Sequence, residues 1–221
     1  MINRGAFKII DDFLTDSELD EAITLADESY KHKSRTHDGG SKYGTLDWFY
    51  SEVVFQNPIV IKFLKKFNLD KSDITKFVIY YLEPGSNIPP HRDNSGASIN
   101  DRIRFHIPIK TNDSVEFIVT KEKIKMIPGD LWILDTSYEH SVYNGGSSSR
   151  SHFVIECEIN STINKYLFND LRAKIHTLEF YLWGLRKLLI AILINSWSQP
   201  KYAKAQLKIL YNFFVKRFFR D

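Results

Sequence analysis

Cysteine is almost absent from this sequence, which contains a single one, Cys157. One thiol cannot form an intramolecular disulfide bond, and it cannot supply the several thiolates of a structural zinc site. A chain without disulfide bonds is typical of a reducing compartment, so we expect a cytoplasmic protein.

Long hydrophobic runs are also missing. Met1–Phe13 has no extended apolar stretch and is acidic at positions 11 and 12, so we expect no secretory signal peptide. The apolar run Leu188–Ile194 has only seven residues, too few to cross a bilayer. The sequence contains no phosphate-binding glycine loop and no nucleophile–base pair, so neither chemistry is predicted.

The chain does have ample material for a packed core, with 43% hydrophobic and 14% aromatic residues in 221. Charge is unevenly distributed along it. Residues 161–221 contain 11 Lys/Arg and 3 Asp/Glu, whereas residues 1–160 contain 19 and 24. We therefore predict one principal domain over residues 1–160 and a basic, aromatic-rich helical appendage over residues 161–221.

The first third of the chain predicts two helices around a polar segment. The expected elements are a strand at Ala6–Ile10, a helix from Glu18 to about Tyr30 behind a capping box at Thr15, a loop over residues 31–47, and a helix at Pro58–Phe67.

From residue 74 the pattern alternates with period two, and turn residues separate the segments. The expected strands are Phe77–Leu82, Arg102–Ile109, Val115–Thr120, Leu131–Asp135 and His152–Ile159. This spacing favours an α+β chain with a mainly β, antiparallel core of the jelly-roll kind and with the N-terminal helices outside it. Residues 161–221 should be helical, with Pro200 between two long segments.

Two histidines and one carboxylate predict a metal site. His91 and Asp93 are two positions apart, so in extended backbone their side chains point the same way and can reach one ion. His140, directly after the expected strand Leu131–Asp135, can supply a third ligand. This set is the facial triad of non-haem Fe(II) oxygenases, which leaves three positions of an octahedral iron open.

Arg150 predicts what occupies those open positions. It follows His140 by ten residues across a Gly-Gly-Ser-Ser turn, and a hairpin of that length would return it beside the metal. The open positions would accept O2 and a bidentate 2-oxoglutarate, and a guanidinium is the best ligand for the far carboxylate of 2-oxoglutarate.

The stretch from about Phe77 to Glu158 resembles the aspartyl/asparaginyl β-hydroxylase family, including bacterial relatives that hydroxylate free proline. The matching segments are His91–Asp93, Arg102–Ile109, Met126–Trp132, and His140–Asn144 followed by Arg150. The resemblance implies a double-stranded β-helix, which is a cupin-like jelly-roll variant. It also implies hydroxylation coupled to decarboxylation of 2-oxoglutarate to succinate.

The same resemblance implies that Arg104 and His106 approach 2-oxoglutarate together with Arg150. Arg104 and His106 are two apart on an expected strand and therefore share a face. Asp93 narrows the implied reaction, because the peptide-hydroxylating branch of the family can lack this carboxylate and a halogenase needs its position empty for chloride. We therefore expect hydroxylation, with a small-molecule substrate favoured over a peptidyl one.

The basic appendage has three interpretations that the sequence does not separate. Its apolar and basic residues recur at helical spacing on different faces, which is typical of a helix on an anionic membrane, here residues 175–221. Packing against the barrel and a homodimer interface account for the pattern as well. The aromatic content argues against nucleic acid. The expected location is cytoplasmic, at the inner face of the membrane if the first interpretation holds.

Three functions follow from these expectations. The leading one is an Fe(II)/2-oxoglutarate dioxygenase that hydroxylates an unactivated C–H bond of a membrane-presented substrate, such as a lipid-linked sugar acid. The second is a soluble hydroxylase of a free amino acid or of a peptidyl Asp, Asn or Pro. The third, of another class, is a non-catalytic jelly-roll scaffold that docks a membrane or a partner.

Overall fold

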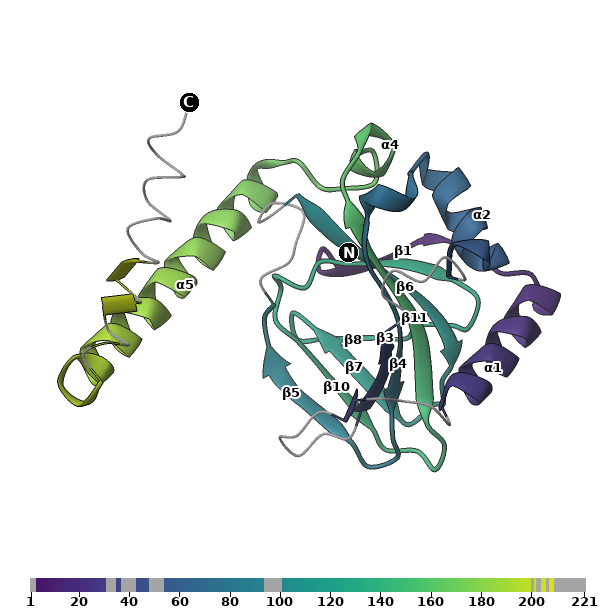
Figure 1. Cartoon of the computed structure of the whole chain (residues 1–221), viewed down its shortest axis with the longest axis horizontal. Coiled ribbons are helices and arrows are strands. Elements are labelled where there is room, and N and C mark those ends of the chain that lie inside the picture. Colours follow the sequence, from purple (N-terminus) through teal and green to yellow (C-terminus); the bar gives the residue numbers. More distant parts are fainter. Residues whose placement is uncertain are drawn as a thin grey trace. The chain divides into compact units, whose positions relative to one another are not determined.

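The computed structural model describes residues 3–30, 35–36, 43–47, 54–93, 101–199 and the single positions 201, 204, 205, 207 and 208. The chain divides into two compact units, Met1–Phe168 and Asn169–Asp221. The strands of the described residues all lie in the first unit, and the second contains the long helix α5 (Leu171–Ser198) (Figure 1).

Within the described residues, the strands form two antiparallel sheets (Figure 1). The larger sheet contains, in spatial order, β1 (Ala6–Ile10), β9 (Leu131–Leu134), β6 (Arg102–Lys110), β11 (Arg150–Glu158), β4 (Ile74–Leu82), β3 (Tyr43–Asp47) and β2 (Arg35–Thr36). The smaller sheet contains β5 (Asn87–His91), β10 (His140–Asn144), β7 (Val115–Val119) and β8 (Glu122–Ile124). Leu82 and Leu134 of the larger sheet share one buried cluster with Phe117 and Val142 of the smaller one, so the sheets face each other. This arrangement confirms the predicted double-stranded β-helix.

The larger sheet is buried on both faces because side chains alternate along its central strands. Phe105 on β6 and Phe153 on β11 belong to the main hydrophobic cluster, which also contains residues of the helices α1 (Asp16–Tyr30) and α2 (Pro58–Phe67). Phe63 of α2 packs edge-on against Phe105, with ring centroids 4.9 Å apart. With this outer face covered by helices, the alternate positions of β6 and β11 line the interior between the sheets.

The smaller sheet brings the two predicted histidine ligands together. β10 pairs with β5 in a register that sets His140 directly opposite His91. Arg150, in contrast, begins β11, which pairs with β4 and β6 in the larger sheet. The predicted hairpin between His140 and Arg150 is therefore wrong: the intervening residues cross from one sheet to the other, and Arg150 reaches the interior from the side opposite His140.

Several predicted elements agree with the structure, among them the strand Ala6–Ile10 and the helix Pro58–Phe67. The capping box at Thr15 is present, since the Thr15 N–H donates to Glu18 Oε2 at 2.8 Å and the Glu18 N–H donates to Thr15 Oγ1 at 3.3 Å. The loop predicted over residues 31–47 is wrong where that segment is described, because β2 and β3 extend the larger sheet beyond β4. Its remaining residues lie outside the described part.

Three strands of the smaller sheet were not predicted. Pro89 and Pro90 argue against a strand in the sequence, because proline has no N–H to donate to a neighbouring strand. β5 is nevertheless a strand, since it lies at the edge of the smaller sheet, where only one side of the strand is paired. β8 has three residues and β10 five, both too short for a clear alternation.

The helical tail also differs from expectation. Before residue 200 it forms two helices rather than one long segment: α4 (Ser161–Asn164), whose Ile163 is buried in the main core, and α5. α5 follows Asp170, whose side chain accepts a hydrogen bond from the Ala173 N–H at 3.1 Å as a helix cap does. Pro200 and most residues after it lie outside the described part. No helix in the described residues is long and apolar enough to cross a membrane.

Candidate active site

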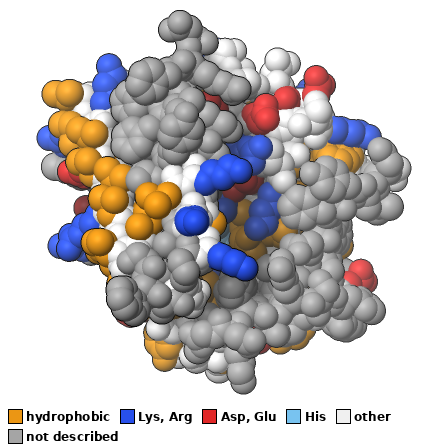
Figure 2. Space-filling view, turned by 60° about the vertical axis from the view of Figure 1, so that its left-hand side comes forward, with side chains coloured by type: hydrophobic (Ala, Val, Ile, Leu, Met, Phe, Trp, Pro, Cys, Tyr) orange, Lys and Arg blue, Asp and Glu red, His pale blue; other side chains and the backbone are white. Residues whose placement is uncertain are grey.

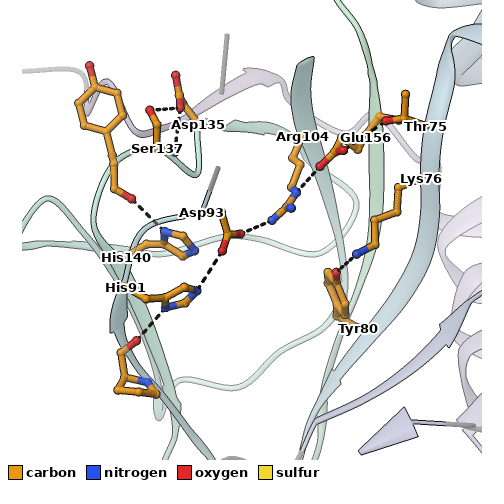
Figure 3. Close-up of polar contacts among 12 residues, drawn as sticks. Thr75, Lys76, Tyr80, His91, Asp93, Arg104, Asp135, Ser137, His140 and Glu156 are labelled. Carbon is orange, nitrogen blue, oxygen red and sulfur yellow. Dashed lines mark hydrogen bonds and ion pairs between the residues drawn. The ribbon is translucent and has the colours of Figure 1, made fainter. Parts of the chain in front are cut away.

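Three side chains from the smaller sheet and the segment after it converge on one point. His91 ends β5, His140 begins β10, and Asp93 is held two residues beyond β5 by its N–H, which donates to the Thr136 carbonyl at 2.8 Å. One potential ligand atom from each of the three side chains lies within 4.8 Å of the others. The spacing predicted from the sequence therefore brings the three groups close enough to share one metal ion (Figure 3).

Both imidazoles are oriented by a backbone carbonyl two residues earlier. His91 Nδ1 lies 2.8 Å from the Pro89 carbonyl oxygen, and His140 Nδ1 lies 2.9 Å from that of Tyr138. A carbonyl can only accept, so each Nδ1 carries a proton, and the neutral form of each ring has its lone pair on Nε2. Burial lowers the pKa of His140, which keeps that ring neutral at neutral pH. Neutral imidazoles with free Nε2 atoms are what a metal requires.

Arg104 connects the predicted carboxylate ligand to a second acid. Its Nη1 donates to Asp93 Oδ2 at 2.5 Å, and its Nε donates to Glu156 Oε2 at 2.7 Å (Figure 3). Burial lowers the pKa of Arg104, but the negative charges of Asp93 and Glu156 outweigh that effect and raise it overall. The other carboxylate oxygen, Asp93 Oδ1, lies 3.8 Å from His91 Nε2 and is thus turned toward the histidines.

A second basic cluster lies on the larger sheet, where Arg150, His152 and His106 are all buried. Arg150 Nη2 donates to His152 Nδ1 at 3.1 Å, and the guanidinium carbon lies 5.6 Å from the Phe117 ring centroid. Among the described residues no carboxylate pairs with Arg150. Burial lowers the pKa of Arg150 to about 9, which still leaves it charged at neutral pH.

Within the described part of the chain, His106 is the residue of this cluster that lacks hydrogen-bond partners on its ring. Neither of its ring nitrogens has a hydrogen-bond partner among the described residues. Burial, followed by the nearby positive charges of Arg150 and Arg104, holds the pKa of His106 well below its ordinary value. A buried, neutral imidazole without partners is costly unless a ligand supplies them.

One cavity of about 150 Å³ joins the two clusters. All six residues predicted from the sequence line it: His91, Asp93, His140, Arg104, His106 and Arg150. Its remaining lining is mainly aliphatic and aromatic, contributed by Tyr80, Tyr81, Leu82, Ile88, Phe117, Leu134, Thr136 and Val142. The geometry places a candidate metal site at one side of a largely apolar cavity and an unpaired positive charge at the other.

Two further residues, His152 and Glu156, contact the side chains of this site and were not predicted from the sequence. Both follow Arg150 at even spacing on β11, so the alternation that pairs Arg104 with His106 also predicts that they face the interior. His152 contacts Arg150, and Glu156 contacts Arg104. Each therefore positions a cavity residue without lining the cavity itself.

Comparisons with known proteins agree with this architecture. The family described as aspartyl/asparaginyl beta-hydroxylase matches residues 49–159. No curated protein sequence matches the chain.

Among solved structures, the non-heme alpha ketoglutarate dependent epimerase SnoN from nogalamycin biosynthesis gives a TM-score of 0.53 at 11% identity, over 70% of this chain and 78% of that one. SnoN in complex with Fe3+, alpha ketoglutarate and nogalamycin RO also gives 0.53, at 10% identity over 70% and 79%. A 2OG-Fe(II) oxygenase family protein from Burkholderia pseudomallei gives 0.46 at 16% identity, over 71% and 85%. At these identities the likeness to SnoN is one of fold.

Proposed function

The chain belongs to the aspartyl/asparaginyl β-hydroxylase family, and from this premise we propose that it is an Fe(II)- and 2-oxoglutarate-dependent dioxygenase that hydroxylates an unactivated C–H bond. One observation carries the proposal. Three potential ligand atoms within 4.8 Å of one another and a buried guanidinium without a carboxylate partner in the described residues line the same cavity.

The metal would be held by His91, Asp93 and His140. Two Nε2 atoms and one carboxylate oxygen form a donor set that suits Fe(II) and leaves positions free for other ligands. The hydrogen bonds from both Nδ1 atoms to backbone carbonyls support this role, because they fix the rings with their lone pairs turned to the carboxylate.

In this proposal Arg104 positions Asp93. By donating to Oδ2 it leaves Oδ1 for the metal, and its second bond to Glu156 prevents the guanidinium from turning away. The family resemblance implies that Arg104 approaches 2-oxoglutarate, but the described contacts engage both its Nη1 and its Nε with carboxylates. A positioning role for Arg104 fits those contacts better.

The far carboxylate of 2-oxoglutarate would bind Arg150, with His106 beside it. A dicarboxylate supplies the negative charge that Arg150 lacks and an acceptor for the N–H of the His106 ring, whose nitrogens are otherwise without partners in the described residues. His152 holds the guanidinium in place through its Nδ1. When bound, iron and 2-oxoglutarate supply the oxidising chemistry with O2, and 2-oxoglutarate is converted to succinate and carbon dioxide.

The protein's own contribution is position and exclusion of water. Leu82, Ile88, Phe117, Leu134 and Val142 line the cavity and keep it apolar around the polar groups. A substrate C–H held against this lining lies next to the metal ligands without bulk water that could intercept the oxidant.

The test is succinate release from 2-oxoglutarate by purified protein with Fe(II) and O2, with His140→Ala as the matched control. We expect a low rate without substrate, a higher rate with the right one, and no iron-dependent rate in the variant. An absence of release with the wild-type protein across broad metabolite and lipid extracts would contradict the proposed activity.

For the substrate we favour a small molecule presented at an anionic membrane, such as a lipid-linked sugar acid. The support lies in the second unit, where Ile190 and Ile194 of α5 are exposed and Lys201, Lys204 and Lys208 are exposed on the helical positions beyond it. The alternative is a free amino acid or a peptidyl Asp, Asn or Pro, which the family membership supports.

Vesicles distinguish these substrates. The full chain should sediment with vesicles that contain anionic phospholipid, and replacing the three lysines by glutamate should abolish this while succinate release from soluble components persists. Membrane presentation would be excluded if the wild-type chain stays in the supernatant. It would also be excluded if a free amino acid raises the rate of succinate release as much as any membrane extract does.

A further inference from the structure

Helix α5 exposes a straight stripe of large apolar side chains. The stripe residues are between 44% and 72% exposed and comprise Leu171, Ile175, Leu178, Leu182 and Leu189. At about 100° per residue they fall within an arc of about 60°. In the space-filling view, hydrophobic side chains gather at the surface beside Lys and Arg (Figure 2). Exposed apolar surface of this kind marks an interaction site.

The stripe lies on a different side of α5 from the buried side chains of this helix. Among the side chains of α5 that the structure describes, Ala173, His176 and Phe180 are buried, each 8% exposed or less. At about 100° per residue their directions are roughly opposite to the stripe. The stripe is therefore apolar surface that α5 leaves exposed, separate from its buried side.

The spacing of the stripe identifies the partner as another helix. Successive stripe residues are separated by 4, 3, 4 and 7 positions, and Leu185 and Ile192 fill the remaining places of the same pattern. This is the a/d repeat of a coiled coil over three heptads, with Ile175, Leu182 and Leu189 at a. Ile190, Leu193 and Ile194 are also exposed and widen the apolar surface near the end of α5 beyond this seam.

The flanking charges indicate that the partner is the same helix. With Ile175 at a, Lys174 occupies a g position and Glu179 the following e position, and the described residues contain no ion pair for either. In a parallel pair of identical helices, the residue at g of one chain faces the residue at the following e position of the other chain. Lys174 of each chain would therefore lie opposite Glu179 of its partner, which gives two such pairs in the dimer. We propose that α5 forms a parallel two-stranded coiled coil with α5 of a second copy of this chain.

This dimer is independent of the oxygenase chemistry and is compatible with a membrane role for the lysines beyond α5. A dimer would carry these lysines twice. If both sets contacted an anionic membrane at the same time, the dimer would bind it more tightly than a monomer does.

The test is the molar mass of the full chain by sedimentation equilibrium at micromolar concentration. We expect twice the 25.8 kDa of one chain. Leu182→Glu should give the monomer, with a dissociation constant raised at least ~100-fold by two buried charges in the seam. Gly184→Glu is the matched control, since it introduces the same residue off the seam where an added Cβ meets nothing within 4 Å, and should stay dimeric.

A charge exchange tests the parallel orientation. Glu179→Lys should raise the dissociation constant about 3- to 10-fold, and adding Lys174→Glu should restore it. A monomeric wild-type chain would overturn the proposal, as would a dimer that survives Leu182→Glu. A monomer that binds anionic vesicles through the stripe, and loses this with Leu182→Glu, would assign the stripe to a membrane instead.

Discussion

Replacing Arg150 by methionine should change stability and ligand binding in opposite directions. The side chain is 7% exposed, its hydrogen-bond acceptor is a neutral histidine, and no carboxylate of the described residues pairs with it. A buried charge without a counter-charge costs several kcal/mol, whereas the variant leaves His152 Nδ1 without a donor at a cost of about 1–3 kcal/mol. We therefore expect the free energy of unfolding without 2-oxoglutarate to rise by about 1–2 kcal/mol.

The same change should remove most of the stabilisation by 2-oxoglutarate. Loss of one partner of a buried charged pair costs about 2–5 kcal/mol, or about 30-fold to several thousand-fold in affinity. At a 2-oxoglutarate concentration of 100 times the wild-type dissociation constant, the wild-type protein gains about 2.7 kcal/mol. The variant should then gain less than about 1 kcal/mol.

The assay is urea unfolding of both proteins with Fe(II) under nitrogen, with and without 2-oxoglutarate. Lys125→Met is the control, because that lysine is exposed and its surface ion pair contributes little. A variant destabilised by more than about 2 kcal/mol without ligand would refute the view that Arg150 lacks a counter-charge. An unchanged gain from 2-oxoglutarate would refute its role as the carboxylate ligand.

Other perturbations test other parts of the site. Arg104→Gln should weaken iron binding about 10- to 100-fold by freeing Asp93, as measured by anaerobic Fe(II) titration; unchanged affinity would refute the positioning role. Burial holds the pKa values of His106 and His152 well below 6.5, so the unfolded chain binds their protons more tightly and stability falls as pH drops below 6.5. The free energy of unfolding should fall by up to about 1.4 kcal/mol per pH unit for each histidine. Urea unfolding of His152→Asn should therefore show a pH dependence smaller by the share of one histidine. Gly5→Ala places a Cβ 2.6 Å from a side-chain atom of β7 and should lower the free energy of unfolding by about 1–3 kcal/mol, whereas unchanged stability would show that the strand can shift.

The site residues were predictable where their relation is local. His91 and Asp93, and likewise Arg104 and His106, are two apart on extended backbone, so a shared direction follows from the geometry of a strand alone. All of them line one cavity. His140 was predicted as the third ligand from its place after an expected strand, but the pairing of β10 with β5 that sets it opposite His91 was not, because nothing in the sequence specifies that pairing.

Relations between distant segments were not predictable. Arg150 lies ten residues after His140, which suggested a hairpin, yet the chain crosses between the sheets there. The bridge from Asp93 through Arg104 to Glu156 joins three segments, and its partners are chosen by packing rather than by spacing. The sequence predicts a loop where β2 and β3 lie, because polar, glycine-rich sequence at the edge of a sheet has no alternating pattern.

The most direct test of the proposed iron site is an anaerobic titration of the full chain with Fe(II) and 2-oxoglutarate, followed by visible absorption. We expect a metal-to-ligand band that requires both components and is absent in His140→Ala. A wild-type protein that develops no band, or a band that His140→Ala retains, would contradict an iron site built from His91, Asp93 and His140.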